Sequence, residues 1–403
     1  MHRRKLLYLG FGFPPGVASA FPEVSPAGHG FETAMIAALR GHCEIKSAGL
    51  LPAAETEFPR TRDASPGVPH ELLLVDKAPE LVHRWQSARR LRRWYEELRR
   101  GGWEPDAVLV YNLPAVFNDF IRWLARQPAR PATVLLLADS STLGQRLPAS
   151  KRLRYRCKPM TWLDDEMLPC FDACVGLSRD TEKFFAPWHV PWLWMPGACD
   201  PAEAPPARPP THAGPIRFGY FGALAGHSGV LEMTRTFLRA TPPATLHVCG
   251  YGRLAGDLRT LAATAPQLKF DGLLPRPGDC LTWAQNLDVL VNPRPANCGN
   301  ENNFPSKLFN YALTGRAILT SRISGVDEVL GASAVYFDPA DFSVALTREF
   351  QQLAAQPRAA LAERGARLRA RVLAEYTWAR QAARLAEFID RVANGRRVVG
   401  ERP

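Results

Sequence analysis

The chain contains no long hydrophobic run. Across its 403 residues, no window reaches the roughly 18 consecutive apolar residues of a membrane-spanning helix. The basic start MHRRKLLYLGFGFPPG also lacks the apolar core and the small-residue cleavage site of a secretory signal. We therefore expect a cytoplasmic protein without a signal peptide.

Closely paired cysteines are also missing. The eight cysteines are scattered, and the nearest two, Cys170 and Cys174, lack the two-residue spacing of zinc and redox motifs. Buried, reduced thiols fit this pattern best. The acidic run LDDEM at 163–167 resembles a metal-binding motif, but no buried strand precedes it, so a solvated helix turn is favoured. Neither pattern therefore predicts a metal site, and no cofactor is expected.

Acidic residues are outnumbered. Lys and Arg total 50 against 39 Asp and Glu, which gives a net charge of +11, and nearly all of the cations are arginine. Such a balance suits anionic partners, which include nucleotides, phospholipid surfaces and nucleic acids. Because no recognised motif interleaves the basic residues with aromatic ones, we do not expect a nucleic-acid partner.

The first half of the chain alternates buried strands with helical patterns. An apolar strand at 5–10 precedes a Gly/Pro-rich loop through Gly30, and a helix is expected at 31–39. Continuous apolar runs that end in polar or small residues follow at 103–112, 132–142 and 171–178. Runs of this kind are typical of strands buried on both faces, so this half is predicted to be an α/β unit with a parallel sheet.

A proline-rich segment then divides the chain. The stretch PAEAPPARPPTHAGP at 201–215 has six prolines and is predicted to be an interdomain linker. Strand patterns resume at 216–229, 245–252, 268–274, 287–293, 316–321 and 334–338, and the tail at 341–395 is helical throughout. The second half therefore predicts another Rossmann-like domain, whose ligands would bind at the carboxyl ends of the strands.

The stretch ENNFPSKLFNYALTG at 301–315 places a lysine in an unfavourable position. Pro305 suits the first residue of a helix and Gly315 suits its C-terminal cap. Lys307 then falls in the first turn, where its charge opposes the helix dipole. A bound phosphate would reverse that sign, whereas the alternative is a lysine that simply extends into water.

Glycine-rich turns follow two strands of the same half. In GYFGALAGHSG, the glycines Gly222, Gly226 and Gly229 bracket His227 and Ser228, and the absence of side chains would let backbone amides approach a diphosphate. The sequence CGYGRLAG at 249–256 repeats the pattern with Arg253 nearby. Packing of the backbone is the alternative role for both turns.

In this order, the glycine turns, FDGLLP, NPRP and NFPSKLFNYALTGRAILTS resemble the donor half of the family 4 (group 1) glycosyltransferases of the GT-B fold. The N-terminal half fits more loosely, through its glycine loop, RGH and PDAVLVYN. The resemblance implies two Rossmann-like domains facing each other across a cleft. Residues 1–200 would be the acceptor domain, with a C-terminal helix near 378–395 packed back on it, and residues 216–377 would be the nucleotide-sugar donor domain.

The resemblance also implies a nucleotide-diphosphate sugar as donor and a transfer without metal. By position, the turn at Gly222 and Ala223 would face the diphosphate, together with Lys307. Leu273 and Leu274 would lie beside the base. The sugar would meet the segment around Phe304, which comprises Asn302, Asn303, Phe304, Pro305 and Ser306. An arginine that many relatives place near the phosphates is absent, and His227, Arg253 and Arg294 are its candidate substitutes.

Two glutamates separated by seven residues are common in the family, one near the donor sugar and one near the ribose. The corresponding positions here are Asn302 and Asn310. Glu301, one residue earlier, would serve as the first carboxylate. Asn310 retains the capacity to donate and accept hydrogen bonds with hydroxyl groups.

Acceptor binding is assigned to the N-terminal half. Asp139 ends an apolar strand and would orient or deprotonate the acceptor hydroxyl, although it could equally cap a helix. Gly28, His29 and Gly30 belong to the loop that would lie over the acceptor.

A basic helix is expected at 81–100, in LVHRWQSARRLRRWYEELRR. One face would carry Leu81, Trp85, Ala88, Leu91, Tyr95 and Leu98, and arginines cover much of the remainder. Packing of this face onto the sheet is the default interpretation. The alternative is contact with an anionic membrane surface or with a lipid-phosphate acceptor.

Together with the resemblance, these features predict a glycosyltransferase that builds a bacterial surface polysaccharide, glycolipid or glycoconjugate, in the cytoplasm or at the inner face of the plasma membrane. The resemblance alone implies that the transfer proceeds with retention and without metal. Its acceptor would be a glycan, a glycolipid or a lipid phosphate. Two alternatives stay open, a nucleotide-sugar 2-epimerase and a protein that binds a nucleotide sugar without turnover.

Overall fold

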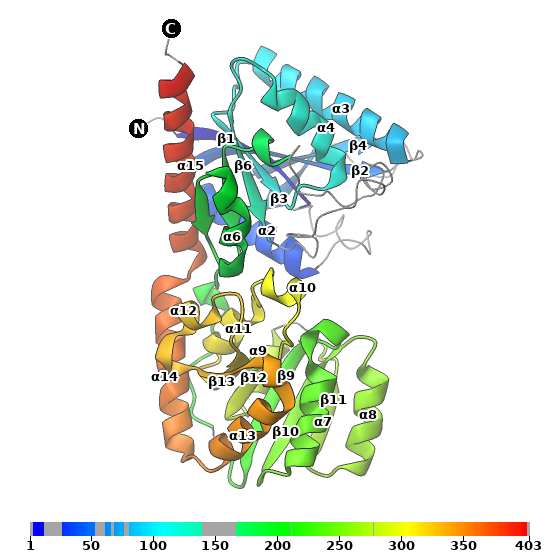
Figure 1. Ribbon diagram of the computed structural model, residues 1–403, viewed down its shortest axis with the longest axis vertical. Helices are drawn as coiled ribbons and strands as arrows, with labels where there is room; N and C mark the ends of the chain where they lie inside the picture. The colour runs from blue at the N-terminus through cyan, green and yellow to red at the C-terminus, as the bar shows by residue number, and fades with distance from the viewer. Residues whose placement is uncertain are drawn as a thin grey trace. The chain divides into compact units, whose positions relative to one another are not determined.

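The computed structural model describes residues 3–11, 26–52, 61–65, 68–75, 80–138, 167–210, 212–276 and 278–400. The chain divides into two compact units (Figure 1), Met1–Met195 with Trp378–Pro403, and Pro196–Thr377. The predictions for Asp139 and for the acidic run at 163–166 lie outside the described residues.

The first unit is built on an eight-stranded sheet with the order β3-β4-β2-β1-β5-β6-β7-β8. Neighbouring strands are parallel except for the antiparallel pair β3 and β4. The strands are β1 (Arg4–Leu9), β2 (Cys43–Pro52), β3 (Thr61–Ser65), β4 (Val68–Val75), β5 (Ala107–Tyr111), β6 (Ala132–Leu137), β7 (Ala173–Gly176) and β8 (Trp192–Trp194). The apolar runs identified the four strands β1, β5, β6 and β7, whereas β2, β3, β4 and β8 were missed.

The helices of this unit are α2 (Pro26–Leu39), α3 (Glu80–Arg100), α4 (Ala115–Ala125), α6 (Glu182–Phe185) and α15 (Trp378–Gly400), with short 3₁₀ turns at Leu168–Cys170, Arg179–Thr181 and Ala186–Trp188. The last helix, α15, packs against α2 and β6 (Figure 1). Arg4 of β1 forms an ion pair with Asp390 of α15 at 2.7 Å, and the rings of Phe31 and Trp378 meet edge to face at 5.1 Å. These contacts fix the C-terminal helix to the first strand and the first helix.

The prediction of a loop through Gly30 was wrong, because α2 already begins at Pro26 and contains Gly28, His29 and Gly30. Proline is tolerated in a first helical turn, where its missing N–H has no intrahelical partner to lose. Glu32, further along α2, accepts hydrogen bonds from the hydroxyl of Tyr8 and from the backbone N–H of Phe11. This carboxylate therefore ties α2 to the end of β1.

The predicted face of α3 is correct for Ala88, Leu91 and Tyr95, which are buried, and for Leu98, which packs against the core, but it is wrong for Trp85. Trp85 was expected on the packed face, but 59% of its surface is exposed, and Trp94 lies in the core instead. The buried side chains of this helix are Arg84, Ser87, Ala88, Leu91, Trp94 and Tyr95. The packed face therefore includes Trp94 in addition to most of the predicted residues, and the exposed side of the helix carries Trp85 among the arginines.

The second unit has a six-stranded parallel sheet with the order β11-β10-β9-β12-β13-β14. Its strands are β9 (Ile216–Ala223), β10 (Ala244–Tyr251), β11 (Leu268–Gly272), β12 (Val289–Asn292), β13 (Ala317–Ser321) and β14 (Val335–Phe337). Numbered within the unit, this is the strand order 3-2-1-4-5-6 of a Rossmann sheet. The order reverses between β9 and β12, and ligands of such sheets bind at the carboxyl ends of the strands at that point.

The helices of the second unit are α7 (Val230–Ala240), α8 (Ala255–Thr264), α9 (Asp279–Ala284), α10 (Cys298–Glu301), α11 (Lys307–Leu313), α12 (Val326–Leu330), α13 (Phe342–Ala354) and α14 (Arg358–Glu375), with 3₁₀ turns at Pro201–Glu203, Gly226–Ser228, Gly331–Ser333 and Pro339–Asp341. The ring of Phe218 in β9 meets Phe237 of α7 and Phe350 of α13 at centroid distances of 5.9 and 5.0 Å. This aromatic cluster joins α7 and α13 to the central strand. Among the described residues, no helix of either unit is both long and apolar enough to cross a membrane.

The proline-rich segment lies along the second unit. Its carbonyl groups accept hydrogen bonds at Pro206 from Gln285, at Arg208 from the buried guanidinium of Arg316, and at Gly214 from Arg358. Proline lacks an N–H group, so the segment can take part in hydrogen bonding mainly as an acceptor. The long side chains of Gln285, Arg316 and Arg358 donate the hydrogen bonds that these carbonyl groups accept.

Replacing Phe350 by alanine tests the aromatic cluster. Because the ring is fully buried against Phe218 and Phe237, we expect Phe350→Ala to lower the free energy of unfolding by about 3–5 kcal/mol in urea titrations. Val344, on the same helix and 77% exposed, provides the control, because Val344→Ala should change it by no more than about 0.5 kcal/mol. Equal stability of the two variants would contradict this account of the core.

Candidate functional site

The candidate site lies at the carboxyl ends of β9 and β12, where the strand order of the second unit reverses. The glycine turn follows β9, and the loop that begins at Pro293 follows β12. Helix α11 begins at Lys307, two residues later than the proline start expected from the sequence. Gly315 follows this helix with φ 71°, the left-handed conformation that suits a glycine after a helix end.

Lys307 is held by Tyr220 of β9. Its Nζ donates a hydrogen bond of 2.8 Å to the Tyr220 hydroxyl and lies 4.3 Å from the centroid of the same ring. That hydroxyl in turn donates to the carbonyl of Ala223 at 2.7 Å. A Cβ atom on Gly222 would lie 3.1 Å from the Lys307 Nζ. The ammonium group is therefore fixed beside the backbone of the glycine turn.

The electrostatics of Lys307 favour an additional anion. Burial lowers the pKa of its ammonium group, the contact with Tyr220 opposes this shift, and the positive charge of Arg294 adds to it. The hydroxyl and the ring face of Tyr220, which contact the ammonium group, carry no full negative charge. An anion bound between Lys307 and Arg294 would stabilise both cations.

The glycine turns allow the ends of neighbouring strands to approach one another. Gly222 and Gly250 have φ of 141° and 150°, and a Cβ on Gly250 would lie only 2.0 Å from the Gly222 carbonyl oxygen. A Cβ on Gly252 would lie 2.5 Å from the carbonyl oxygen of Leu224. Packing of the backbone, the alternative role considered for the turn after β10, is therefore the role of these two glycines, because neighbouring backbone atoms fill the space that a side chain would need.

The loop after β12 is fastened to the glycine turn. A Cβ on Gly229, whose φ is 69°, would lie 1.8 Å from the carbonyl oxygen of Pro293. The buried amide of Asn300 donates to the carbonyls of His227 and Pro295 at 3.1 and 2.9 Å. Asn300 thus links the two segments that meet at the reversal of the sheet.

A strained serine supports the same loop from below the site. Ser324 has φ 60°, and its buried hydroxyl lies 2.9, 3.0 and 3.1 Å from the carbonyl oxygens of Asn300, Glu301 and Asn303. Residues in sparsely populated backbone conformations persist where the surroundings hold them in place. The sequence analysis missed Ser324 and Asn300, because neither belongs to a recognised motif.

Two arginines complete the cationic surroundings. Arg294 donates through Nη1 to the backbone oxygen and the side-chain oxygen of Asn303 at 3.3 and 3.2 Å. Arg253 reaches the glycine turn, because a Cβ on Gly226 would lie 2.9 Å from its Nη2. The structure therefore brings together the predicted residues Gly222, Lys307 and Asn303 with Arg294, and it places Arg253 at the same turn.

The remaining predicted donor residues differ in exposure. Phe304 and Pro305 are buried, and the ring of Phe304 packs on Phe309 at 5.6 Å, so Phe304 serves the core. Asn302 is buried and Glu301 is half-buried, whereas Ser306 and Asn310 are exposed. The Asn310 side chain forms no hydrogen bond with the described residues, and its contact with a donor stays a prediction.

Exposed apolar side chains lie at the ends of two neighbouring strands. Leu273 follows β11 and is 67% exposed, and Tyr251 ends β10 and is 57% exposed. Leu274 is half-buried. The carboxyl ends of parallel strands meet at one edge of the sheet, so these side chains offer an apolar surface at the same edge as Lys307. The sequence analysis did not predict a role for Tyr251, because this residue lies between Gly250 and Gly252 in a turn that was interpreted only through its glycines.

The predicted acceptor residues Gly28, His29 and Gly30 belong to the first unit, near the start of α2. His29 and Gly28 are half-buried and Gly30 is exposed, and a Cβ on Gly30 would meet no atom within 4 Å. Within the described part of both units, no three His, Cys, Asp or Glu side chains are grouped closely enough to hold a metal ion.

The sequence and the fold are similar to those of known proteins. Residues 260–387, which include Lys307 and the loop before it, match the family described as "Glycosyl transferase-like". The lipopolysaccharide outer core galactosyltransferase WaaB in its apo form is similar to the chain with a TM-score of 0.65 at 12% identity, over 96% of this chain and 99% of that one. The chain has the GT-B fold and carries a glycosyl transferase-like domain. The fold class predicted from the sequence is confirmed.

Two further solved structures share the GT-B fold. Sucrose-phosphate synthase from Thermosynechococcus elongatus has a TM-score of 0.67 at 13% identity and covers 98% of this chain and 100% of its own. Anabaena Alr3699/HepE, solved in complex with UDP, has a TM-score of 0.64 at 12% identity, with 96% and 100% coverage. A search of curated proteins gives no match.

Gly229 provides a test of the turn that follows β9. Because its φ is positive and a Cβ would collide with Pro293, we expect Gly229→Ala to destabilise the second unit by more than about 1 kcal/mol in thermal or urea unfolding. Gly256 in α8 is the matched control, since a Cβ there meets nothing within 4 Å. Gly256→Ala should leave the stability unchanged or raise it by up to about 1 kcal/mol, and the reverse order would contradict the described turn.

Proposed function

We propose that the chain is a glycosyltransferase that moves a sugar from a nucleotide-diphosphate donor to an acceptor hydroxyl. The observation that carries this proposal is the position of Lys307, whose ammonium group is held by Tyr220 beside the glycine turn at the reversal of the sheet. The family match over 260–387 and the GT-B fold support it. The solved complex of HepE with UDP makes UDP the first nucleotide to test.

In this proposal, the diphosphate would lie between the glycine turn and the cations Lys307 and Arg294. Cleavage of the bond between the anomeric carbon and the donor oxygen leaves negative charge on the departing diphosphate. Cations already held in place would stabilise that charge without reorganising. Arg253, which lies over Gly226, would contribute from the outer side of the turn.

The remaining donor contacts extend from the same edge. Tyr251 and Leu273 would border the base with their exposed apolar surfaces. Glu301 and Asn302, in the loop that Ser324 supports, would meet the sugar, and Asn310 would meet the ribose. We further propose retention of configuration and a transfer that needs no metal.

The acceptor would bind to the first unit. We propose that Asp139 and the segment with Gly28, His29 and Gly30 contact a glycan, a glycolipid or a lipid phosphate during synthesis of a bacterial surface glycan. Work in the cytoplasm, with peripheral contact at the inner face of the plasma membrane, follows from such an acceptor.

A screen of nucleotide sugars without acceptor tests the proposed activity. We expect one class of nucleotide-diphosphate sugar to raise the melting temperature and to undergo slow hydrolysis by water acting as acceptor. Release of an epimerised donor would instead support a 2-epimerase. Binding without hydrolysis, followed by failure to transfer to any acceptor in a glycan and lipid-phosphate screen, would support a non-catalytic binding protein.

Lys307 is tested by calorimetry with UDP. Loss of a hydrogen bond to a charged group costs about 1.5–3 kcal/mol, so we expect Lys307→Ala to weaken UDP binding by that amount. Lys269, an exposed lysine of β11 in the same unit, provides the matched control, and Lys269→Ala should bind UDP as the parent chain does. Unchanged affinity in Lys307→Ala would remove the diphosphate role assigned to this residue.

Asp139→Asn separates an acceptor role from a structural one. If the carboxylate orients or deprotonates the acceptor, turnover should fall while UDP affinity stays the same, because the donor is held by the other unit. Full turnover in steady-state assays would reduce Asp139 to a helix cap.

A further inference from the structure

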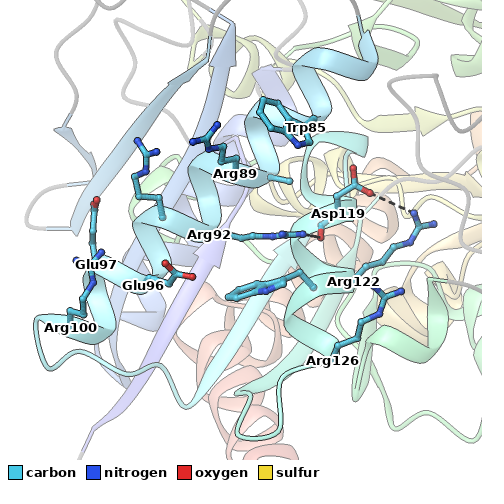
Figure 2. A pocket seen from close by; sticks show the side chains of 12 residues that line it. Trp85, Arg89, Arg92, Glu96, Glu97, Arg100, Asp119, Arg122 and Arg126 are labelled. Carbon is cyan, nitrogen blue, oxygen red and sulfur yellow. Dashed lines mark hydrogen bonds and ion pairs between the residues drawn. The ribbon is translucent and has the colours of Figure 1, made fainter.

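The helices α3 and α4 of the first unit form a surface rich in arginine. They pack side by side, and a depression of about 860 Å³ lies over them (Figure 2). Six arginines and three acidic residues line this depression, which leaves a net charge of +3. We call this region the arginine surface, and it is lined by Trp85, Ala88, Arg89, Arg92, Arg93, Glu96, Glu97, Arg100, Asp119, Arg122, Trp123 and Arg126.

The acidic side chain of Asp119 is already neutralised by neighbouring cations. Its carboxylate lies 3.5 Å from a guanidinium nitrogen of the buried Arg84 and 3.6 Å from that of Arg122. Arg92 is also occupied, because it lies over the ring of Trp123 at 5.3 Å and donates to the Asp119 carbonyl. These contacts organise the floor between the two helices.

Four other arginines are available to a ligand. Arg89, Arg93, Arg100 and Arg126 are exposed, and none of them has a hydrogen bond or an ion pair within the described part of the chain. In Figure 2, Arg89 lies near Trp85 at one end of the view, whereas Glu96, Glu97 and Arg100 lie at the other. At the end with Arg89, the labelled acid is Asp119, whose carboxylate pairs with Arg84 and Arg122.

Exposed apolar side chains accompany this positive end. Val82 and Trp85 lie one turn apart on α3, and 45% and 59% of their surfaces are exposed. Arg89 and Arg93 continue the same face one and two turns further on. A large exposed aromatic next to unpaired cations is a combination typical of an interaction surface.

We propose that the arginine surface docks on anionic phospholipid headgroups. Guanidinium groups bind phosphate with two parallel hydrogen bonds, and tryptophan favours the boundary between headgroups and acyl chains. Each basic residue near an anionic surface contributes about a fivefold gain in binding. The proposal is independent of the donor site, because all of these residues belong to the first unit and the donor residues belong to the second.

A lipid surface fits these residues better than a nucleic acid. Bases of single-stranded nucleic acids stack on open aromatic faces. Here the guanidinium of Arg89 lies over the ring of Trp85 at 5.4 Å, and that of Arg92 lies over Trp123. One face of each ring is thus occupied by a cation, which leaves less ring surface for stacking, while the exposed parts of Trp85 and Val82 can still enter a headgroup layer.

Vesicle cosedimentation with the full chain tests the docking. We expect binding to vesicles of phosphatidylcholine with phosphatidylglycerol, little binding to phosphatidylcholine alone, and release by added salt. The double variant Arg89→Glu with Arg93→Glu should bind at least about 30-fold more weakly, since it removes two basic residues and adds two acidic ones. Trp85→Ala should also weaken binding and should abolish part of the fluorescence change on vesicle addition.

A matched charge change elsewhere provides the control. Arg235 and Arg259 are exposed arginines of the second unit without ion pairs among the described residues, so Arg235→Glu with Arg259→Glu alters the net charge equally. This control should keep most of the vesicle binding. An equal loss in both double variants, full binding by the Arg89 and Arg93 variant, or equal binding to both vesicle types would overturn the proposal.

Two further measurements separate this proposal from others. Binding of single-stranded DNA through Arg89 and Arg93 without vesicle binding would also overturn it, in favour of a nucleic-acid surface. UDP calorimetry on the same variants should give the parent affinity. A parent chain that binds anionic vesicles but no nucleotide would contradict the proposed transferase function and leave the docking surface supported.

Discussion

An ammonium group that leaves water needs acceptors to replace the lost solvent, and Lys307 finds them in Tyr220. The tyrosine hydroxyl accepts a hydrogen bond from Nζ and donates one to the Ala223 carbonyl, while the ring face lies next to the charge. Burial still lowers the pKa of the lysine, so the charged form is not fully compensated. The candidate donor site is built around this remaining demand for negative charge.

Close approach of backbone segments makes that placement possible. Glycines at 222, 229, 250 and 252 stand where a Cβ would meet another residue's carbonyl oxygen or the lysine itself. Their common effect is to bring the ends of β9, β10 and β12 within reach of α11. Gly250 and Gly252, at the end of β10, therefore act through packing, and the cations beside the turn after β9 would supply the chemistry of the proposed donor site. A glycine-rich motif can thus support a ligand site without contacting the ligand at every glycine.

The parts of the fold that could be predicted from the sequence share one property. Each is encoded in a continuous stretch of sequence and can be recognised without knowing which segments pack against it. The apolar runs of β5, β6 and β12 are buried on both faces, and Lys307 was identified by its offset from Pro305 and Gly315. The residues that were missed act through contacts between distant segments. Asn300 and Ser324 form hydrogen bonds that join the loop after β12 to the turn after β9 and to the turn before α12. Contacts between segments so far apart in the sequence leave no periodic pattern from which they could be predicted.

Helix α3 shows why amphipathic patterns fix a face only approximately. Trp85 and Trp94 lie nine residues apart, which at 3.6 residues per turn places them on different sides of the helix. Either could have been packed, since the arginines between them can extend their aliphatic stems over an apolar floor and keep their charge in water. The α4 residues Phe120 and Trp123 decide the choice, because they meet the ring of Tyr95 edge to face. That contact fixes the rotation of α3, buries Trp94, and leaves Trp85 exposed beside the unpaired arginines.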